Sequence, residues 1–191
     1  MPNTITAIDT GLKLCRFDES FIGEHYLSWL NNRELMRYSR QRRTEHTKES
    51  CLSYLKSFDG SPNYFFAVID SSDNRHIGNI TVYVDTYTNI ADIGIMMGER
   101  KSNGKGYGKM AWGLTMAYLF DRLNIRKITA GTMECNIGMI KVAQHWNMKQ
   151  EAQLRQQDLY DGKPVDIVRF GILKSEWETL PYRPTLHNSD I

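Results

Sequence analysis

In one short segment of this 191-residue chain, residues 104–108, every second residue is glycine. Gly104, Gly106 and Gly108 are separated by Lys105 and Tyr107, directly after an apolar run with the composition of a strand. Glycine lets a backbone turn tightly and approach a ligand closely. The helix-like stretch that follows would carry partial positive charge at its N-terminus. Together these features predict a cradle of backbone N–H groups for a pyrophosphate.

Two common phosphate loops do not fit this segment. A P-loop requires Gly-Lys-Ser/Thr at a set distance from an earlier glycine, but the sixth position counted from Gly98 is Asn103. A dinucleotide fingerprint requires a third glycine three residues after the second. Counted from Gly104 and Gly106, that position is Lys109. The segment is therefore another kind of phosphate loop, unless it only connects a strand to a helix.

The glycine spacing resembles the acyl-CoA loop of the GNAT N-acetyltransferase superfamily. Members carry Gln/Arg-x-x-Gly-x-Gly/Ala at this point. If the glycine pair is Gly106 and Gly108, Asn103 takes the Gln/Arg position. If the pair is Gly104 and Gly106, Lys101 takes it instead. Both assignments stay open at this stage.

A second segment strengthens the resemblance. The second family motif consists of an Asn, a short helix, Gly-Phe and a strand with Glu-Gly-x-Leu-Arg. Asn136, Glu151, Leu154 and Arg155 fall in register with this motif, whereas Asn147 replaces its glycine. One helix and one strand separate the two motifs, as in the family. Within the superfamily the chain is most similar to the branch of ribosomal-protein alanine and amino-sugar acetyltransferases.

The hydrophobic pattern and the resemblance predict the same fold class. It is mixed α/β, with a central, mostly antiparallel seven-stranded sheet flanked by helices on both faces. Alternating or short apolar runs indicate the strands, and apolar residues three and four apart indicate the helices. We expect one domain over 1–191, with a core over 12–175 and a poorly ordered or surface tail over 179–191. The expected strands cover 12–17, 64–69, 76–84, 90–97, 127–133, 148–154 and 165–173, and the expected helices cover 21–30, 47–58, 106–122 and 136–146.

Composition narrows the class of protein further. A 41% hydrophobic content allows a substantial core, and a net charge of +2 gives no reason to expect DNA binding. Cys15, Cys51 and Cys135 form neither a CxxC pair nor a zinc spacing, so we expect free thiols and no metal. No apolar run is long enough for a membrane span, and no signal-peptide pattern is visible. We therefore expect a cytoplasmic protein without a membrane partner.

The resemblance also implies a reaction, the transfer of an acetyl group from acetyl-CoA to a primary amine. The glycine loop would bind the pyrophosphate, and the end of the 90–97 strand would pair with the pantetheine arm. An amide near Met96 or Met97 would then face the thioester oxygen, and Asn136 would bind the arm. The expected cofactor-binding residues are Met96, Met97, Lys101, Asn103, Gly104, Lys105, Gly106, Tyr107, Gly108 and Asn136.

The acid and base of this reaction are harder to assign. Alkyl amines are protonated at neutral pH, so a base or a water relay is useful. The candidate bases are Asp92, Glu99 and Glu134, of which Asp92 lies on an otherwise apolar strand. Many family members supply the acid from a Tyr seven residues after the motif Asn. Here that position is Ala143.

Positive charge concentrates early in the chain, next to aromatic residues. The segment is either a solvated loop or a lid that meets an anionic acceptor. The second interpretation favours a small amine acceptor linked to a nucleotide. The expected acceptor-binding residues are Trp29, Tyr38, Arg40, Arg42 and Arg43.

Three functions therefore stay open. The first is acetylation of an amino-sugar nucleotide, and the second is N-terminal acetylation of a ribosomal protein. The third is a non-catalytic acyl-CoA sensor, which the absent Tyr at Ala143 keeps open. Family members are often dimers, so a homodimer is open as well.

Overall fold

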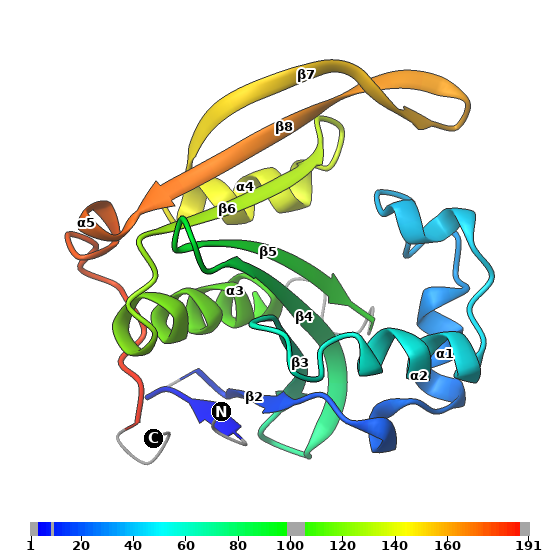
Figure 1. The fold of residues 1–191 in the computed structure, drawn as a ribbon, viewed down its shortest axis with the longest axis horizontal. Coiled ribbons are helices and arrows are strands. Elements are labelled where there is room, and N and C mark those ends of the chain that lie inside the picture. The colour runs from blue at the N-terminus through cyan, green and yellow to red at the C-terminus, as the bar shows by residue number, and fades with distance from the viewer. Residues whose placement is uncertain (1–3, 9, 99–105, 188–191) are drawn as a thin grey trace.

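A single mixed sheet organises the chain, as the computed structural model shows for residues 4–8, 10–98 and 106–187. Its strand order is β1-β2-β3-β4-β5-β6-β8-β7 (Figure 1). Neighbouring strands are antiparallel except for β5 and β6. The strands are β1 Thr4–Thr6, β2 Leu12–Arg16, β3 Tyr64–Asp70, β4 Arg75–Asp85, β5 Ile90–Met97, β6 Lys127–Met133, β7 Lys149–Tyr160 and β8 Lys163–Leu173.

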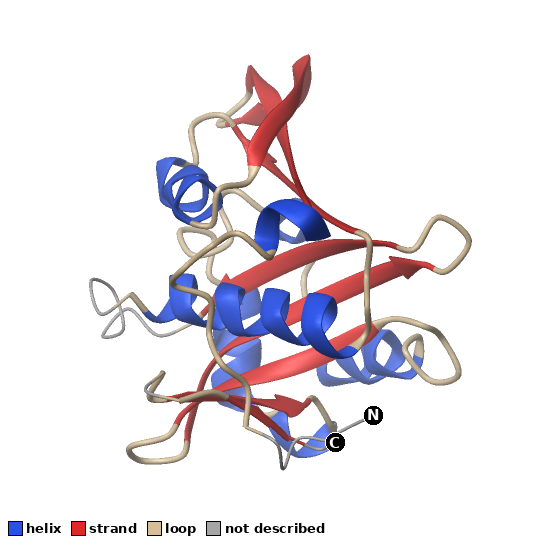
Figure 2. Ribbon diagram, turned by 90° about the vertical axis from the view of Figure 1, so that its left-hand side faces the viewer, coloured by secondary structure: helices blue, strands red, loops and turns tan. Residues whose placement is uncertain are grey.

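Helices pack on both faces of this sheet (Figures 1 and 2). One face carries α1 and α2, and the other carries α3 and α4. Within the described ranges, no helix combines the length and apolarity of a membrane span, and no three His, Cys, Asp or Glu side chains cluster as metal ligands would. The helices are α1 Glu24–Leu30, α2 Lys48–Lys56, α3 Tyr107–Ala117 with a π-helical turn Tyr118–Arg122, α4 Ile137–His145 and α5 Lys174–Trp177, with 3-10 turns η1 Glu19–Phe21 and η2 Arg40–Arg43.

The central strand β3 explains why both faces need helices. Phe66 and Val68 belong to the core cluster beneath α3. Phe65, Ala67 and Ile69 belong to a second cluster beneath α1 and α2. Successive side chains of a strand point to opposite faces. A strand that is apolar on both faces, as β3 is from Tyr64 to Ile69, must therefore be covered on both sides.

The predicted fold class is confirmed, with one correction to the strand count. The sheet has eight strands rather than seven, because residues 4–6 pair with β2 as the edge strand β1. Three residues are too few to give a period-two signal in the sequence. The antiparallel meander expected over 64–97 is present as β3, β4 and β5.

The chain just before the expected tail, and the described part of that tail up to residue 187, pack against the body of the domain. Trp177 is fully buried, stacks on Phe120 at 5.5 Å between ring centroids, and donates an indole N–H to Asp121 at 3.0 Å. Further on, Leu186 forms an isolated bridge with Ala7. Apolar side chains placed among prolines thus anchor the C-terminal segment beside the N-terminus.

The single parallel contact of the sheet is very short. Only Ile90–Asp92 of β5 pairs with residues 127–129 of β6. Beyond that point β5 stays paired with β4, and β6 stays paired with β8. The sheet therefore divides into two antiparallel halves that diverge from a common fork.

Two helical glycines give a direct test of this packing. A Cβ on Gly113 of α3 would lie 2.0 Å from the Trp146 ring, which a hydrogen bond to the Lys109 carbonyl fixes in place. We expect Gly113→Ala to lower the free energy of unfolding by about 1–3 kcal/mol, despite the better helix propensity of alanine. A Cβ on Gly138 of α4 would approach no atom closer than 3.7 Å, so Gly138→Ala is expected to stabilise by about 0.5–1 kcal/mol. Urea denaturation measures both, and equal effects would contradict the packing described here.

Candidate active site

The fork between β5 and β6 opens into a cleft of about 470 Å³. This volume lies within the usual range of small-molecule sites. Its walls come from the diverging strands, from the helices α3 and α4, and from the loop that follows α1. The lining residues are Leu35, Met36, Tyr38, Ser39, Arg40, Ile93, Gly94, Ile95, Met96, Met97, Trp112, Gly131, Thr132, Met133, Asn136, Met139, Asp158, Ile167 and Arg169.

Strand β5 directs alternate backbone groups into this cleft. The N–H of Gly98 donates to the carbonyl of Ile77 in β4 at 2.9 Å. Hydrogen-bonded positions alternate along an antiparallel pair, so Met96 faces β4 while Ile95 and Met97 face the cleft. Of the two methionines expected to contact the cofactor through the backbone, Met97 is the one whose amide is turned the right way.

Helix α3 begins next to the end of β5. Its N-cap, Gly106, has a left-handed backbone with φ of 77° and offers no side chain to cap the helix. A Cβ on Gly108 would lie 3.4 Å from the Met97 side chain, so the first helical turn packs against the strand end. The first turn contains no acidic residue. First-turn amides have no intrahelical acceptor, and these features make the helix start a suitable anion site.

Tyr107 has a different role from its neighbours. Its side chain hydrogen-bonds to the carboxylate of Asp70 at the end of β3, and this bond raises the pKa of the phenol. The side chain therefore anchors the start of α3 to the sheet. Five expected residues, Glu99, Lys101, Asn103, Gly104 and Lys105, lie outside the described residues and stay predictions.

Asn136 begins α4 at the edge of the cleft. Its Oδ1 accepts from the N–H of Met139 at 3.3 Å, and its Nδ2 donates to Thr132 Oγ1 at 2.9 Å. Oδ1 thus caps the start of α4, and Nδ2 ties this helix start to β6. The structure brings Asn136 to the cleft, where it shapes the wall.

Asp92 and Glu134, the two candidate bases that the structure describes, both accept hydrogen bonds from residues of neighbouring strands. Asp92 lies at the fork, where it accepts from Thr129 Oγ1 at 2.7 Å and from Arg169 at 2.8 Å. Glu134 is exposed beyond β6 and accepts from the backbone N–H of Asp166 at 3.2 Å. Their roles as bases stay predictions.

A second cavity of about 390 Å³ lies on the α1/α2 face of β5. We call it the chamber. Cleft and chamber share the backbone of β5 at Gly94, Ile95 and Met96, together with Met36 and Ser39 from the loop. The remaining lining residues are Tyr26, Leu30, Gln41, Thr44, His46, Ser50, Cys51, Tyr54, Asn79, Thr81 and Tyr83.

The chamber combines apolar and polar side chains, with no Lys or Arg among the described residues that line it. No Asp or Glu is present among the described residues that line it. The hydroxyls of Tyr54 and Tyr83 are hydrogen-bonded at 2.6 Å, and burial together with this bond raises the pKa of Tyr54. Burial likewise raises the pKa values of Tyr26 and Cys51. Apart from His46, the polar side chains of the lining are therefore hydrogen-bonding groups without charge.

The sequence analysis missed the β4 side of the chamber. Asn79, Thr81 and Tyr83 lie opposite Met96, Gly94 and Asp92 in the β4–β5 register. They look like the polar half of an ordinary half-buried strand. The sequence feature that could have identified them is their spacing of two residues, because three polar residues with that spacing lie on one face of a strand.

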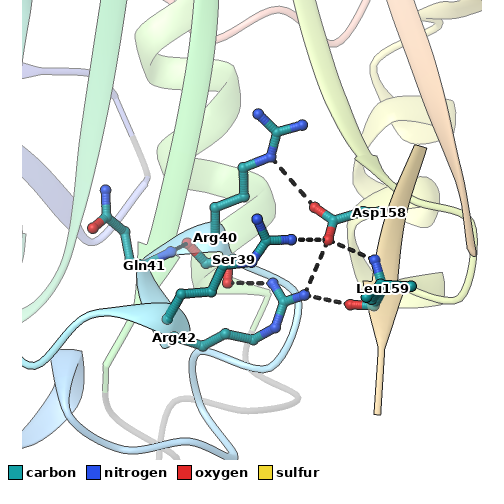
Figure 3. A network of polar contacts seen from close by, with 7 residues as sticks. Ser39, Arg40, Gln41, Arg42, Asp158 and Leu159 are labelled. Carbon is teal, nitrogen blue, oxygen red and sulfur yellow. Dashed lines mark hydrogen bonds and ion pairs between the residues drawn. The ribbon is translucent and has the colours of Figure 1, made fainter. Parts of the chain in front are cut away.

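The arginine-rich segment is held to the β7–β8 hairpin (Figure 3). Arg40 and Arg42 contact Asp158 of β7 at 3.3 and 3.2 Å, and Arg43 contacts the same carboxylate. Arg42 also donates to the carbonyls of Ser39 and Leu159. The loop expected to be a lid is thus a fixed wall over the cleft in this structure.

The charge balance of this cluster is positive. The Asp158 side chain is only 2% exposed. Burial would raise its pKa, but the Leu159 N–H and the arginines outweigh burial, so the pKa of Asp158 is lowered. One carboxylate then faces three guanidinium groups. Arg40 and Arg43 keep 67% and 54% of their side chains exposed, so part of this charge reaches solvent.

The two expected aromatic residues have separate roles. Tyr38 lines the cleft, stacks on Tyr160 with 5.6 Å between ring centroids, and lies under the Arg37 guanidinium. Trp29 is 5% exposed and packs against His76, whose pKa is lowered to about 4 by burial. Trp29 therefore stabilises the core beneath α1 and does not line the chamber.

Comparisons with known proteins agree with this geometry. A family model described as an acetyltransferase (GNAT) domain matches residues 13–149. The probable N-acetyltransferase YjcK of Bacillus subtilis is 26% identical over 136 residues, which is 70% of this chain and 75% of that protein.

Two solved structures show the likeness of the fold. Spermidine N-acetyltransferase from Vibrio cholerae, in complex with CoA and spermine, has a TM-score of 0.78 at 20% identity and covers 90% of this chain and 100% of its own. The ribosomal L7/L12 alpha-N-protein acetyltransferase RimL, in complex with CoA, has a TM-score of 0.77 at 18% identity and covers 88% and 97%.

A pair of glycine substitutions tests the anion site at the start of α3. Valine at position 106 would have to adopt a left-handed backbone, which costs about 1–2 kcal/mol and reshapes the turn. We expect Gly106→Val to abolish acetyl-CoA binding in isothermal titration calorimetry. Gly60 also has a positive φ, 68°, in open space away from the cleft. Gly60→Val should therefore carry a similar backbone cost and still bind. Tight acetyl-CoA binding by folded Gly106→Val would show that the pyrophosphate lies elsewhere.

Proposed function

Because this chain belongs to the GNAT acetyltransferase family, we propose that its acceptor is the primary amine of a small polyhydroxylated molecule, best represented by a nucleotide-linked amino sugar. The observation that carries the proposal is the chamber beside the cleft, whose described lining residues include no Asp, Glu, Lys or Arg. Its hydroxyl, amide and imidazole groups can exchange hydrogen bonds with the hydroxyls of a sugar. The enzyme is an acetyl-CoA-dependent acyltransferase, and the proposal concerns the identity of the amine that receives the acetyl group.

The cleft suits the acyl-CoA side of the reaction. The Ile95 and Met97 amides face it from β5, and Trp112 contributes an indole Nε1 that is buried without a partner among the described residues. An extended pantetheine arm carries amide carbonyls that would satisfy such donors. The pyrophosphate would then lie at the start of α3. Acetyl-CoA supplies the activated thioester, whose C–S bond breaks as the C–N bond to the amine forms.

The chain's own contribution to the chemistry is orientation and charge stabilisation. Gly94 leaves the strand between cleft and chamber without a side chain, so an amine in the chamber can approach the thioester there. An amide of Ile95 or Met97 would donate to the carbonyl oxygen as negative charge develops. The amine gives up one proton and the departing sulfur gains one. The hydroxyls of Tyr38, Ser39 and Thr132 line the route for this transfer.

The electrostatics separate an amino sugar from a polyamine. A polyamine carries several ammonium groups, and burying them without carboxylates is costly. The carboxylate among the described cleft residues is Asp158, which the arginine cluster already neutralises. The surplus positive charge around Arg40 suits a phosphate on the acceptor instead.

The test measures thiol release with four acceptors in the parent and two arginine variants. The acceptors are a nucleotide-linked amino sugar, the same sugar without the nucleotide, spermidine and a peptide with a free N-terminus. We expect the nucleotide-linked sugar to be preferred. Arg40→Gln should raise its KM about tenfold and leave the acetyl-CoA KM unchanged, because one charge-assisted contact is lost. Arg43→Gln is the control, since Arg43 shares the Asp158 contact but lines neither cavity.

Other outcomes would replace the proposal. A preference for the peptide would favour N-terminal acetylation of a protein, and a preference for spermidine would overturn the electrostatic reasoning. Stabilisation by acetyl-CoA without turnover of any amine would favour the non-catalytic sensor, since ligand binding alone raises the apparent stability.

A further inference from the structure

One buried amide in the chamber has an unused hydrogen-bond acceptor. Asn79 is 8% exposed, and its Oδ1 is completely buried with no partner among the described residues. A buried polar atom without a partner destabilises a folded protein. Most buried polar atoms are paired, so an exception in a cavity points to a ligand group that completes it.

The register of the sheet fixes the position of this amide. Asn79 lies on β4 directly opposite Met96, and the next residue on the same face, Thr81, lies opposite Gly94. Asn79 therefore flanks the part of β5 that cleft and chamber share. An amine that attacks a thioester in the cleft must lie close to this point.

We propose that Asn79 binds the acceptor amine: its side-chain amide, whose Oδ1 has no exposed surface in the free protein, turns about χ2 so that Oδ1 reaches the chamber and accepts one of the amine's N–H groups. The proposal rests on the proposed function, because it requires an amine in the chamber. An N–H held by Asn79 would orient the nitrogen so that its lone pair can face the thioester. The contact would supply the partner that Oδ1 lacks and would fix the reacting atom in place.

The neutrality of this group suits its role. A carboxylate at the same position would favour the ammonium form of the acceptor, since a nearby negative charge stabilises a cation. Ammonium has no lone pair and cannot attack. An amide oxygen orients the amine without this penalty. The choice of asparagine is thus consistent with a chamber that has no carboxylate among its described residues.

The test compares Asn→Leu at two positions. The Oδ1 of Asn79 has no hydrogen-bond partner among the described residues, whereas the Oδ1 of Asn63 has one. Asn79→Leu keeps the branching of the side chain at a somewhat larger volume and removes the unpaired acceptor, so we expect an equal or higher Tm, by up to about 4 °C. The kcat/KM for the acceptor should fall about 10- to 100-fold. Acetyl-CoA affinity by calorimetry should stay unchanged. Asn63 is the control, because its Oδ1 accepts from the Val84 N–H at 2.9 Å. Asn63→Leu should lower Tm and leave kcat/KM unchanged.

Asn79→Ala covers the case in which leucine does not fit, and should show the same kinetic loss. A lower Tm with unchanged kcat/KM in both Asn79 variants would overturn the proposal. If the parent prefers another amine, the proposed acceptor is wrong, and the Asn79 variants are then measured with that amine. Absence of turnover with every amine would overturn both.

Discussion

The short parallel pairing of β5 and β6 is the constraint on which the rest of the site depends. The two strands are joined over Ile90–Asp92 and residues 127–129, and each then follows its own antiparallel partner. Inside a protein, backbone groups require hydrogen-bond partners. A fork of this kind leaves one edge of each strand open, so it suits an extended ligand that carries its own amide groups.

A small polar cluster stabilises the fork. Asp92 on β5 joins Thr129 on β6 and Arg169 on β8. These contacts cross from one half of the sheet to the other at the last paired position. These contacts give a structural reason for a carboxylate on an otherwise apolar strand. They join the two halves of the sheet at the fork.

Strand β5 also separates two chemically different spaces. The α3/α4 side offers backbone donors and a helix N-terminus, as an anionic, amide-bearing cofactor requires. The α1/α2 side offers hydrogen-bonding side chains with no carboxylate among the described lining residues, which suits an amine that must stay unprotonated. Gly94 connects the two because it brings no side chain between them. The arginine loop, held through Asp158, closes the cleft on its outer side.

Local patterns in the sequence were sufficient for most of the fold. The runs 90–97 and 127–133 predicted two strands with the observed bounds, and the glycine alternation predicted the start of α3. The three-residue β1 was missed because it is too short to show a period. The packing of the C-terminal segment was missed because Trp177 and Leu186 find their partners far away in the sequence.

The site was predictable only where its residues are neighbours in the chain. Asp92 looked like a base because its partner Arg169 lies 77 residues further on. The contact of the arginines with Asp158 was not predicted because Asp158 lies 116 residues after Arg42. Asn79 carried only the signal of its period-two alternation with Thr81 and Tyr83, since a buried atom without a partner is a property of the fold and not of the sequence. Local sequence patterns do not predict contacts between residues that are far apart in the chain.

The most direct measurement is backbone amide hydrogen exchange, residue by residue, with and without saturating acetyl-CoA. If the pantetheine arm pairs with the open edge of β5, exchange at Ile95 and Met97 will slow markedly on binding. Met96 will change little, because its amide faces β4 in the absence of ligand. Binding that leaves Ile95 and Met97 as exchangeable as before would contradict the account of the fork as the acyl-CoA site.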